Sequence, residues 1–301
     1  MSIEVINLSK FFGEQAAVNS ISFSIKKGEV VGFLGPNGAG KSTTMKMITG
    51  FIPASQGKAL INGIQVHPDH IKTRSMVGYL PESNPLYYDM YVKEYLRFVG
   101  SIYRVPKLKT RIQELIEMVG LQVEQHKKIG ALSKGYKQRV GLAQAFIHDP
   151  EVLILDEPTS GLDPNQILEI RELIKHLGQH KTILLSTHIM QEVEAICDRV
   201  IIINQGKIVA DQSRDELKQN LDKESIYVEF DRTINAAELK KIDGIKSLAP
   251  EGKGWLLQVD PNKDVKRQLA QLAKEKDWLT IAMKNEERGL EDLFKELTKK
   301  K

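Results

Sequence analysis

Two short stretches combine residue types that can hold and attack a phosphate group. The first, GPNGAGKS at Gly35–Ser42, has two glycines five residues apart, followed by a lysine and a hydroxyl. It follows the apolar run VVGFL and precedes KSTTMKMI, so we expect it between a strand and a helix. Glycines let backbone N–H groups curl around phosphate oxygens, and the helix N-terminus adds positive partial charge. Lys41 is expected to reach the β- and γ-phosphates, and Ser42 to offer its hydroxyl to Mg²⁺. A flexible glycine-rich turn is the alternative interpretation.

The second stretch, VLILDEPTSGLD, places two acids at the end of an apolar run. Asp156 is expected to hold Mg²⁺, through a water molecule. Glu157 is expected to orient the attacking water or to accept its proton. Adjacent acids at a strand end also serve simply as solvated or turn-capping groups. The phosphate loop in the same chain favours the chemical interpretation.

A third stretch, ALSKGYKQRVGLAQA at residues 131–145, reads as the start of a helix almost a hundred residues after the phosphate loop. Ser133 can cap this helix and Gly135 allows close approach to its first turn. The chain therefore has a second helix start of a kind that suits a phosphate.

Composition narrows the class of protein. The chain has 301 residues, 41% of them hydrophobic, and 43 basic against 39 acidic side chains. This small excess of charge argues against nucleic acid as a partner. The single cysteine, Cys197, is expected to be a small buried hydrophobe in a reducing compartment. No run approaches the roughly 18 apolar residues of a membrane-spanning helix, so we expect a cytoplasmic chain that reaches a membrane only through a partner.

The pattern along the chain predicts an α/β fold with two domains. Residues 1–220 begin with β-rich runs, turn helical from about 85 to 150, and continue with the buried strands VLILDE and TILLST on either side of a helix. Residues 221–301 repeat a smaller α/β plan: strand SIYVEF, helix AAELKKI, strands KSLAPE and WLLQV, helix DVKRQLAQLAKEKD, strand LTIAM and helix GLEDLFKELT. We interpret this as an accessory domain that regulates, contacts a membrane partner or braces a dimer. The terminal Lys299–Lys301 is a solvated tail or a lipid contact.

The phosphate loop, LSKGYKQR, ILDEP, SGLD and STH, in this order, resemble the ATP-binding subunit of an ABC transporter. The resemblance covers residues 1 to about 220. LSKGYKQR with GYLPE and the C-terminal extension is similar to the bacterial gliding-motility-associated subgroup, and the multidrug-type ATPases share much of it. It implies a P-loop NTPase fold: a RecA-like core with an antiparallel β subdomain and a helical subdomain.

The resemblance also implies roles for individual residues. Phe12 would stack on adenine, although a core phenylalanine is the alternative and Phe11 beside it suits that role. His188 would contact the γ-phosphate, and Asp163 would bridge two subunits. Ser133 and Gly135 would cap the γ-phosphate of ATP held by the opposite subunit, so two copies would close head-to-tail around two ATP molecules. The nucleotide-binding set is then Phe12, Gly35, Pro36, Asn37, Gly38, Ala39, Gly40, Lys41, Ser42, Thr43, Ser133, Gly135 and Asp163, with Glu157 and His188 catalytic and Ser42, Asp156 and Glu82 at the metal.

Three positions depart from the family pattern Leu-Ser-Gly-Gly-Gln and from its usual glutamine before the helical region. Lys134 replaces a glycine and either adds charge near the partner's phosphates or points to solvent. Tyr136 replaces glutamine and is expected to pack. Glu82 stands where glutamine is usual, and its carboxylate still suits Mg²⁺.

The sequence thus predicts an ATP-hydrolysing subunit that drives integral-membrane partners from the inner face of the cell membrane, with ATP and Mg²⁺ as cofactors. The partners would dock on the helical region, where SNPLYYDMYVKEYL supplies either a surface or local core. A soluble ABC-type ATPase acting on the ribosome or chromosome is the alternative, but one phosphate loop and no long heptad run argue against it. A P-loop kinase leaves LSKGYKQR and DEPTSGLD unexplained.

Overall fold

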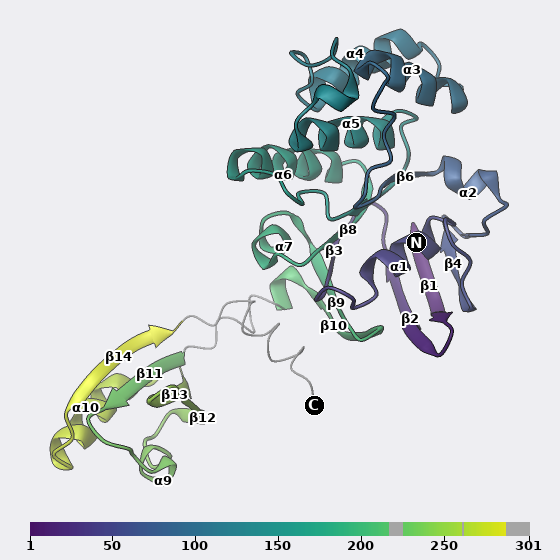
Figure 1. The fold of residues 1–301 in the computed structure, drawn as a ribbon. Helices are drawn as coiled ribbons and strands as arrows, with labels where there is room; N and C mark the ends of the chain where they lie inside the picture. Colours follow the sequence, from purple (N-terminus) through teal and green to yellow (C-terminus); the bar gives the residue numbers. More distant parts are fainter. Residues whose placement is uncertain (217–224, 261, 287–301) are drawn as a thin grey trace. The chain divides into compact units, whose positions relative to one another are not determined.

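The computed structural model describes residues 1–216, 225–260 and 262–286. The chain divides into two compact units, Met1–Arg214 and Asp215–Lys301. Figure 1 shows the fold, with labels on most of the helices and strands. The predicted boundary near residue 220 lies outside the described residues.

A six-stranded mixed sheet forms the centre of the first unit. Its order is β10 (Lys207–Ser213), β9 (Arg199–Asn204), β3 (Val30–Leu34), β8 (Thr182–Thr187), β7 (Val152–Asp156) and β6 (Val77–Leu80). Neighbouring strands from β9 to β6 run parallel, and β10 closes one edge antiparallel to β9. Every residue of β3, β7 and β8 is buried, because both faces of these strands are covered. The prediction of buried parallel strands is confirmed.

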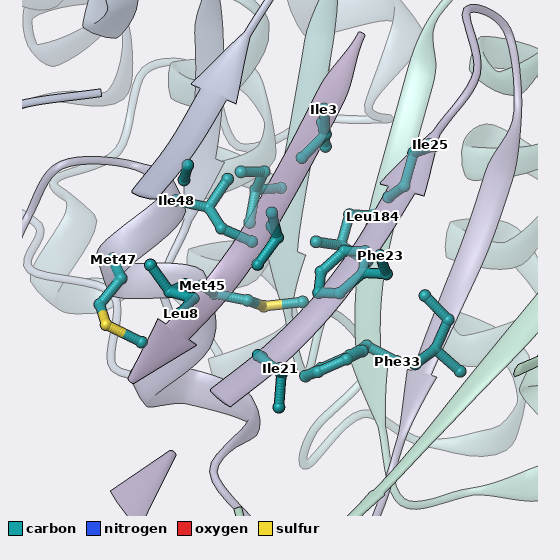
Figure 2. Close-up of a cluster of buried hydrophobic side chains, with 14 of the residues drawn as sticks. Ile3, Leu8, Ile21, Phe23, Ile25, Phe33, Met45, Met47, Ile48 and Leu184 are labelled. Atoms are coloured by element: carbon teal, nitrogen blue, oxygen red, sulfur yellow. The ribbon is translucent and has the colours of Figure 1, made fainter. Parts of the chain in front are cut away.

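An antiparallel sheet packs against this central sheet. It has the order β2 (Gln15–Ile25), β1 (Ile3–Phe12), β4 (Gln56–Ile61) and β5 (Ile64–Gln65). Figure 2 shows the shared core, in which Phe23 of β2 lies 5.7 Å from Phe33 of β3 between ring centroids, and Met45 comes from α1 (Lys41–Ile48). Burying each such side chain contributes about 1.5–3 kcal/mol, so this core fixes α1 and the loop before it.

Helices make up the rest of the unit. α2 (Ile71–Ser75) precedes β6, and α3 (Val92–Ile102), α4 (Leu108–Met118), the 3₁₀ turn η1 (Ile129–Ala131) and α5 (Lys134–Phe146) lie in the predicted helical region. α3, α4 and α5 lie together at one end of the unit in Figure 1, and the Tyr95 hydroxyl of α3 donates to Gln144 of α5. α6 (Pro164–Gly178) and α7 (Met190–Ile196) follow β7 and β8.

The second unit is a four-stranded antiparallel sheet with helices. Its order along the chain is β11 (Ser225–Phe230), α9 (Ala236–Leu239), β12 (Ile245–Glu251), β13 (Gly254–Val259), α10 (Val265–Glu275) and β14 (Thr280–Glu286). The sheet order β12-β13-β11-β14 makes this a βαββαβ unit of ferredoxin-like topology. Its core includes Val228, Leu257 and Leu269. The predicted final helix, at residues 289–298, and the three terminal lysines lie outside the described residues.

Two expectations from composition concern the single cysteine and membrane-spanning helices. Cys197 is 2% exposed, and burial raises the pKa of its thiol, which makes it a structural side chain rather than a nucleophile. Within the described ranges, no helix has the length and apolar character needed to cross a membrane.

Candidate nucleotide site

A cavity of about 660 Å³ opens where the phosphate loop meets the ends of the central strands. The phosphate loop supplies one wall. Glu82, Glu157 and His188 supply a second wall, and the start of β2 supplies a third. The lining residues are Gln15, Ala16, Ala17, Asn37, Gly38, Ala39, Gly40, Lys41, Ser42, Thr43, Glu82, Glu157, Ser160, His188, Gln205 and Gly206. Its size and polar lining suit a nucleotide.

The phosphate loop holds a backbone shape that only glycine accepts easily. Gly40 has a φ of 108°, and a Cβ there would lie 2.6 Å from the Ala17 carbonyl oxygen. Gly40 is also the N-cap of α1 and offers no side chain to the first turn. The first N–H groups of α1 are therefore left for a ligand, and the helix dipole favours an anion there.

Lys41 is held inside the loop by its own backbone. Its Nζ donates to the Gly35 carbonyl at 2.8 Å and to the Pro36 carbonyl at 3.3 Å. The same ammonium lies 3.6 Å from Glu157 Oε1, and both side chains are buried. Gly35 and Pro36 thus position the lysine rather than line the cavity. An arriving triphosphate offers Lys41 more negative charge than one carboxylate does.

The predicted metal ligands Ser42 and Asp156 lie within hydrogen-bond distance of each other. Ser42 Oγ donates to Asp156 Oδ1 at 3.1 Å, and Ser186 Oγ donates to the same oxygen at 2.5 Å. Asp156 is 1% exposed. A hydroxyl and a carboxylate are oxygen ligands of the kind that Mg²⁺ prefers together with phosphate oxygens. Across the residues that the structure describes, no group of three or more His, Cys, Asp and Glu side chains suits a metal.

Glu157 is set in an unusual backbone conformation next to Asp156. Its φ is 49°, and its N–H donates to Ser186 Oγ at 3.0 Å. Such left-handed positions cost about 1–3 kcal/mol and persist where the surroundings enforce them. Burial raises the pKa of the Glu157 carboxyl, while His188 and Lys41 lower it to a smaller extent. A base with a raised pKa is better matched to proton transfer near neutral pH.

His188 completes this group. Its Nδ1 lies 2.9 Å from Glu157 Oε2, and half of the side chain is exposed. It follows β8 directly, so the strand end places it beside the strand end that carries Glu157. The histidine can therefore contact both the carboxylate and a ligand in the cavity.

Glu82 also lines the cavity, from the segment after β6, and it is exposed. Burial first, and then the charges of Asp156 and Glu82, raise the pKa of the neighbouring Tyr79 phenol. Glu82 thus lines the same cavity as Ser42, and its place at the metal stays a prediction.

Phe12 does not line the cavity, although the first residues of the next strand, β2, do. Its ring is 55% exposed at the end of β1, with Lys10 Nζ 5.3 Å from the ring centroid. Phe11 is 38% exposed and is not part of the core. A core role is therefore wrong for Phe12 and for Phe11, and the stacking of Phe12 on adenine stays a prediction.

The second helix start is capped as expected. Ser133 Oγ accepts a hydrogen bond from the Tyr136 N–H at 3.4 Å, and α5 begins at Lys134. A Cβ on Gly135 would lie 2.3 Å from Gln166 Oε1, so the glycine leaves room for the Gln166 side chain of α6 at the start of α5. Asp163 caps α6 by accepting from the Gln166 N–H at 2.9 Å. Ser133, Gly135 and Asp163 thus belong to one structural group, and none of them lines the cavity.

Comparisons with known proteins agree with this geometry. Residues 18–160 match the family model described as ABC transporter. The chain is 38% identical over 250 residues to the linearmycin resistance ATP-binding protein LnrL of Bacillus subtilis, covering 82% of this chain and 79% of LnrL. It is 40% identical over 230 residues to the bacitracin transport ATP-binding protein BcrA of Bacillus licheniformis, covering 76% and 74%.

The chain belongs to the ATP-binding proteins of the ABC transporters. Solved structures support the same conclusion: an ATP-binding subunit of an ABC transporter superposes with a TM-score of 0.67 at 32% identity, covering 73% of this chain and 93% of that one. The ATP-binding cassette MJ0796, solved as a dimer in a post-hydrolysis state with ADP and Pi, gives 0.65 at 25% identity, covering 70% and 98%. The predicted family, the ATP-binding function and the ABC-type ATPase activity are confirmed.

The departures from the usual pattern of this ATPase family have defined surroundings. Lys134 is exposed, and a Cβ on Gly161 would lie 2.0 Å from its Nζ, so the side chain lies over the SGLD loop of its own chain. Tyr136 is half-buried, and the Arg139 guanidinium lies 5.8 Å from its ring centroid. The expectation that Tyr136 packs agrees with this contact.

Several cavity residues of the ATPase were missed by sequence reasoning. Ser160 lies in VLILDEPTSGLD, a stretch already singled out. Ser186 does not line the cavity but donates to Asp156, and it lies in the strand TILLST. Gln205 and Gly206 come from the turn between β9 and β10, and no motif marks them. Only the parallel pairing of β3 with β9 brings that turn to the phosphate loop.

Proposed function

We propose that two copies of this chain close head-to-tail around two ATP molecules and so drive an integral-membrane partner. The observation that carries the proposal is the separation of two phosphate-binding elements within one chain. The cavity is built from the phosphate loop, Glu157 and His188, whereas Ser133 and Gly135 are not among its lining residues. A second copy gives that helix start a triphosphate to cap, as the dimeric cassette MJ0796 suggests by its assembly.

Each residue of the cavity then has one task. Backbone N–H groups of the loop bind the phosphates. The Lys41 ammonium leaves its ion pair with Glu157 and binds the β- and γ-phosphates instead. Glu157 is released to orient the attacking water and to accept its proton, while His188 holds the carboxylate and contacts the γ-phosphate. Magnesium, when bound by Ser42, Asp156 and Glu82, supplies charge neutralisation on the phosphates.

Magnitudes explain why such a dimer can open and close. A hydrogen bond to a charged group contributes about 1.5–3 kcal/mol, and a helix N-terminus facing an anion roughly 0.3–2 kcal/mol. Two sites give several kcal/mol that depend on the γ-phosphate. Because every 1.4 kcal/mol is about tenfold, hydrolysis would weaken closure on the order of a thousandfold.

The segment before α3 offers a surface for the membrane partner. Tyr87, Tyr88 and Tyr91 are each about half exposed, whereas Leu86 of the same segment and Tyr95 of α3 are buried. The Tyr87 ring packs 5.7 Å from Phe98 between centroids, which keeps the surface ordered. Docking there would hold the chain at the inner face of the cell membrane.

The relatives favour a transporter of the antibiotic or multidrug type, since LnrL carries linearmycin resistance in its name and BcrA bacitracin transport. The gliding-motility-associated subgroup stays a prediction from LSKGYKQR and GYLPE. The ferredoxin-like second unit would be an accessory domain that regulates, contacts the partner or braces the dimer.

Co-purification tests the transport function. An integral-membrane protein should co-purify with the chain. A ribosome- or chromosome-bound ATPase would co-purify with no such protein.

The Glu157→Gln variant tests the chemistry. It keeps the size of the side chain but removes the base, so we expect preserved ATP binding, at least a hundredfold lower turnover and an ATP-trapped dimer. Steady-state phosphate release and equilibrium nucleotide binding measure the two effects. Turnover at the wild-type rate would show that Glu157 is not the base.

A further inference from the structure

A buried carboxylate lies between the two loops that carry Glu157 and His188, and the proposed mechanism does not use it. Glu192 is on α7 and is 1% exposed. Charged side chains are almost never this deeply buried unless they are paired, because removing a carboxylate from water costs several kcal/mol. The partners of Glu192 therefore indicate what the structure gains from it.

Both carboxylate oxygens accept hydrogen bonds from hydroxyl groups, one from the loop after β7 and one from the last residue of β8. Oε1 accepts from the Thr159 hydroxyl, and Oε2 accepts from Thr187 Oγ1 at 2.7 Å. The Thr187 oxygen itself accepts the Ile189 N–H at 3.0 Å, so the hydrogen of this hydroxyl is left to point at Glu192. Both threonines are buried. We call Thr159, Thr187 and Glu192 the carboxylate clamp.

The clamp is adjacent to the reacting groups in sequence. Thr159 follows Glu157 by two residues, and Thr187 immediately precedes His188. A shift of either threonine would therefore move the Glu157–His188 contact of 2.9 Å. Arg171 of α6 lies 3.9 Å from Oε1 through Nη2, which balances the charge and connects the clamp to the helix that Asp163 caps.

Simple packing does not require such a group. The same helix buries Val193 and Ile196, and α6 buries Ile170 and Ile174, so an apolar side chain at position 192 would suit this layer without the cost of a buried charge. An apolar side chain makes no directional contacts such as hydrogen bonds. Two hydrogen bonds to one rigid carboxylate fix the separation of two loops, as packing alone does not.

We propose that Glu192 is a positioning residue for ATP hydrolysis, which holds the loop of Glu157 and the loop of His188 at one separation through Thr159 and Thr187. This inference rests on the proposed roles of Glu157 and His188. It adds that a residue of α7, outside the cavity lining, sets the alignment of Glu157 with His188. The clamp itself does not touch the nucleotide.

The first test compares Glu192→Gln with Glu194→Gln in the full chain. The amide keeps the size of the side chain but offers one acceptor oxygen where the carboxylate offers two. We expect kcat to fall roughly 10- to 100-fold with unchanged affinity for ATP, since misplacing reacting groups by about 1 Å costs about that much. Glu194 is exposed on the same helix, so its variant should match the wild type.

The second test uses milder changes at Thr187. Thr187→Val removes the hydroxyl at nearly constant volume and is expected to lower kcat, whereas Thr187→Ser keeps the hydroxyl and should recover most of the rate. In a His188→Ala background, Thr187→Val should lower kcat no further, because its effect passes through the histidine.

The outcomes separate the inference from the mechanism beneath it. If Glu157→Gln and His188→Ala lose turnover while Glu192→Gln and Thr187→Val keep it, the positioning role is wrong and the mechanism stands. If the Glu157 and His188 variants keep wild-type turnover, the mechanism itself is wrong. A fall in ATP affinity and Tm together with kcat in the clamp variants would make the clamp a structural feature alone and would also overturn the inference.

Discussion

Glu157 is the proposed base, and its surroundings predict a pH dependence. Burial raises the pKa of its carboxyl. The base form exists above that pKa and is lost as the pH falls through it, so the acid limb of turnover should lie above about 4.3, where an ordinary glutamate titrates. The pH profile of kcat/KM for ATP gives this limb, because kcat/KM reports the pKa of the enzyme before ATP binds. A limb at or below 4.3 would contradict the assignment.

Lys41 has a different task, and its ammonium contacts the Gly35 and Pro36 carbonyls and the Glu157 carboxylate. We expect Lys41→Ala to bind ATP about 10- to 100-fold more weakly, which is the 1.5–3 kcal/mol of a hydrogen bond to a charged group. Equilibrium binding of a fluorescent ATP analogue measures this. Lys46→Ala, in the last turn of the same helix, is the matched control and should bind normally. Equal loss in both variants would show that α1 rather than the ammonium was disturbed.

At the scale of elements, Asp163 serves two purposes that can be separated. It caps α6, so Asp163→Ala should lower stability by about 1 kcal/mol, or a Tm shift of about 2–4 °C. Asp163→Asn keeps a capping oxygen and should keep the Tm. A loss of ATP-dependent turnover in Asp163→Asn at unchanged Tm would then report the bridging role between subunits, whereas full turnover would count against that role.

How far the sequence predicts these elements depends on how local each feature is. The phosphate loop was predictable because glycine spacing, lysine and the flanking strand and helix are contiguous at 30–48. The cap at Ser133 was predictable for the same reason. The clamp was not, since Thr159 and Glu192 are 33 residues apart and meet only after β7, β8 and α7 are folded. The surroundings of Lys134 were likewise hidden, because Gly161 comes from another loop.

For the whole molecule, we propose that a second copy gives the helix start at Ser133 its ligand. The ferredoxin-like unit has no role fixed by sequence. Its βαββαβ order follows from alternation of strand and helix patterns, which are again local. The surface through which this unit binds other proteins depends on its tertiary contacts and on its partners. Neither leaves a periodic pattern in the sequence.

The central claim is a shared pocket, and a crosslink between chains tests it most directly. Cys197 is buried with a raised thiol pKa, so cysteines introduced at exposed positions would be the reactive ones. In the Glu157→Gln background, we would combine Ser133→Cys with Asn37→Cys, whose loop lines the cavity. With ATP, mild oxidation should link two chains covalently on a non-reducing gel. Without ATP, or with Ser133→Cys alone, the link should be weak. A variant that binds ATP yet forms no link between chains would contradict the account.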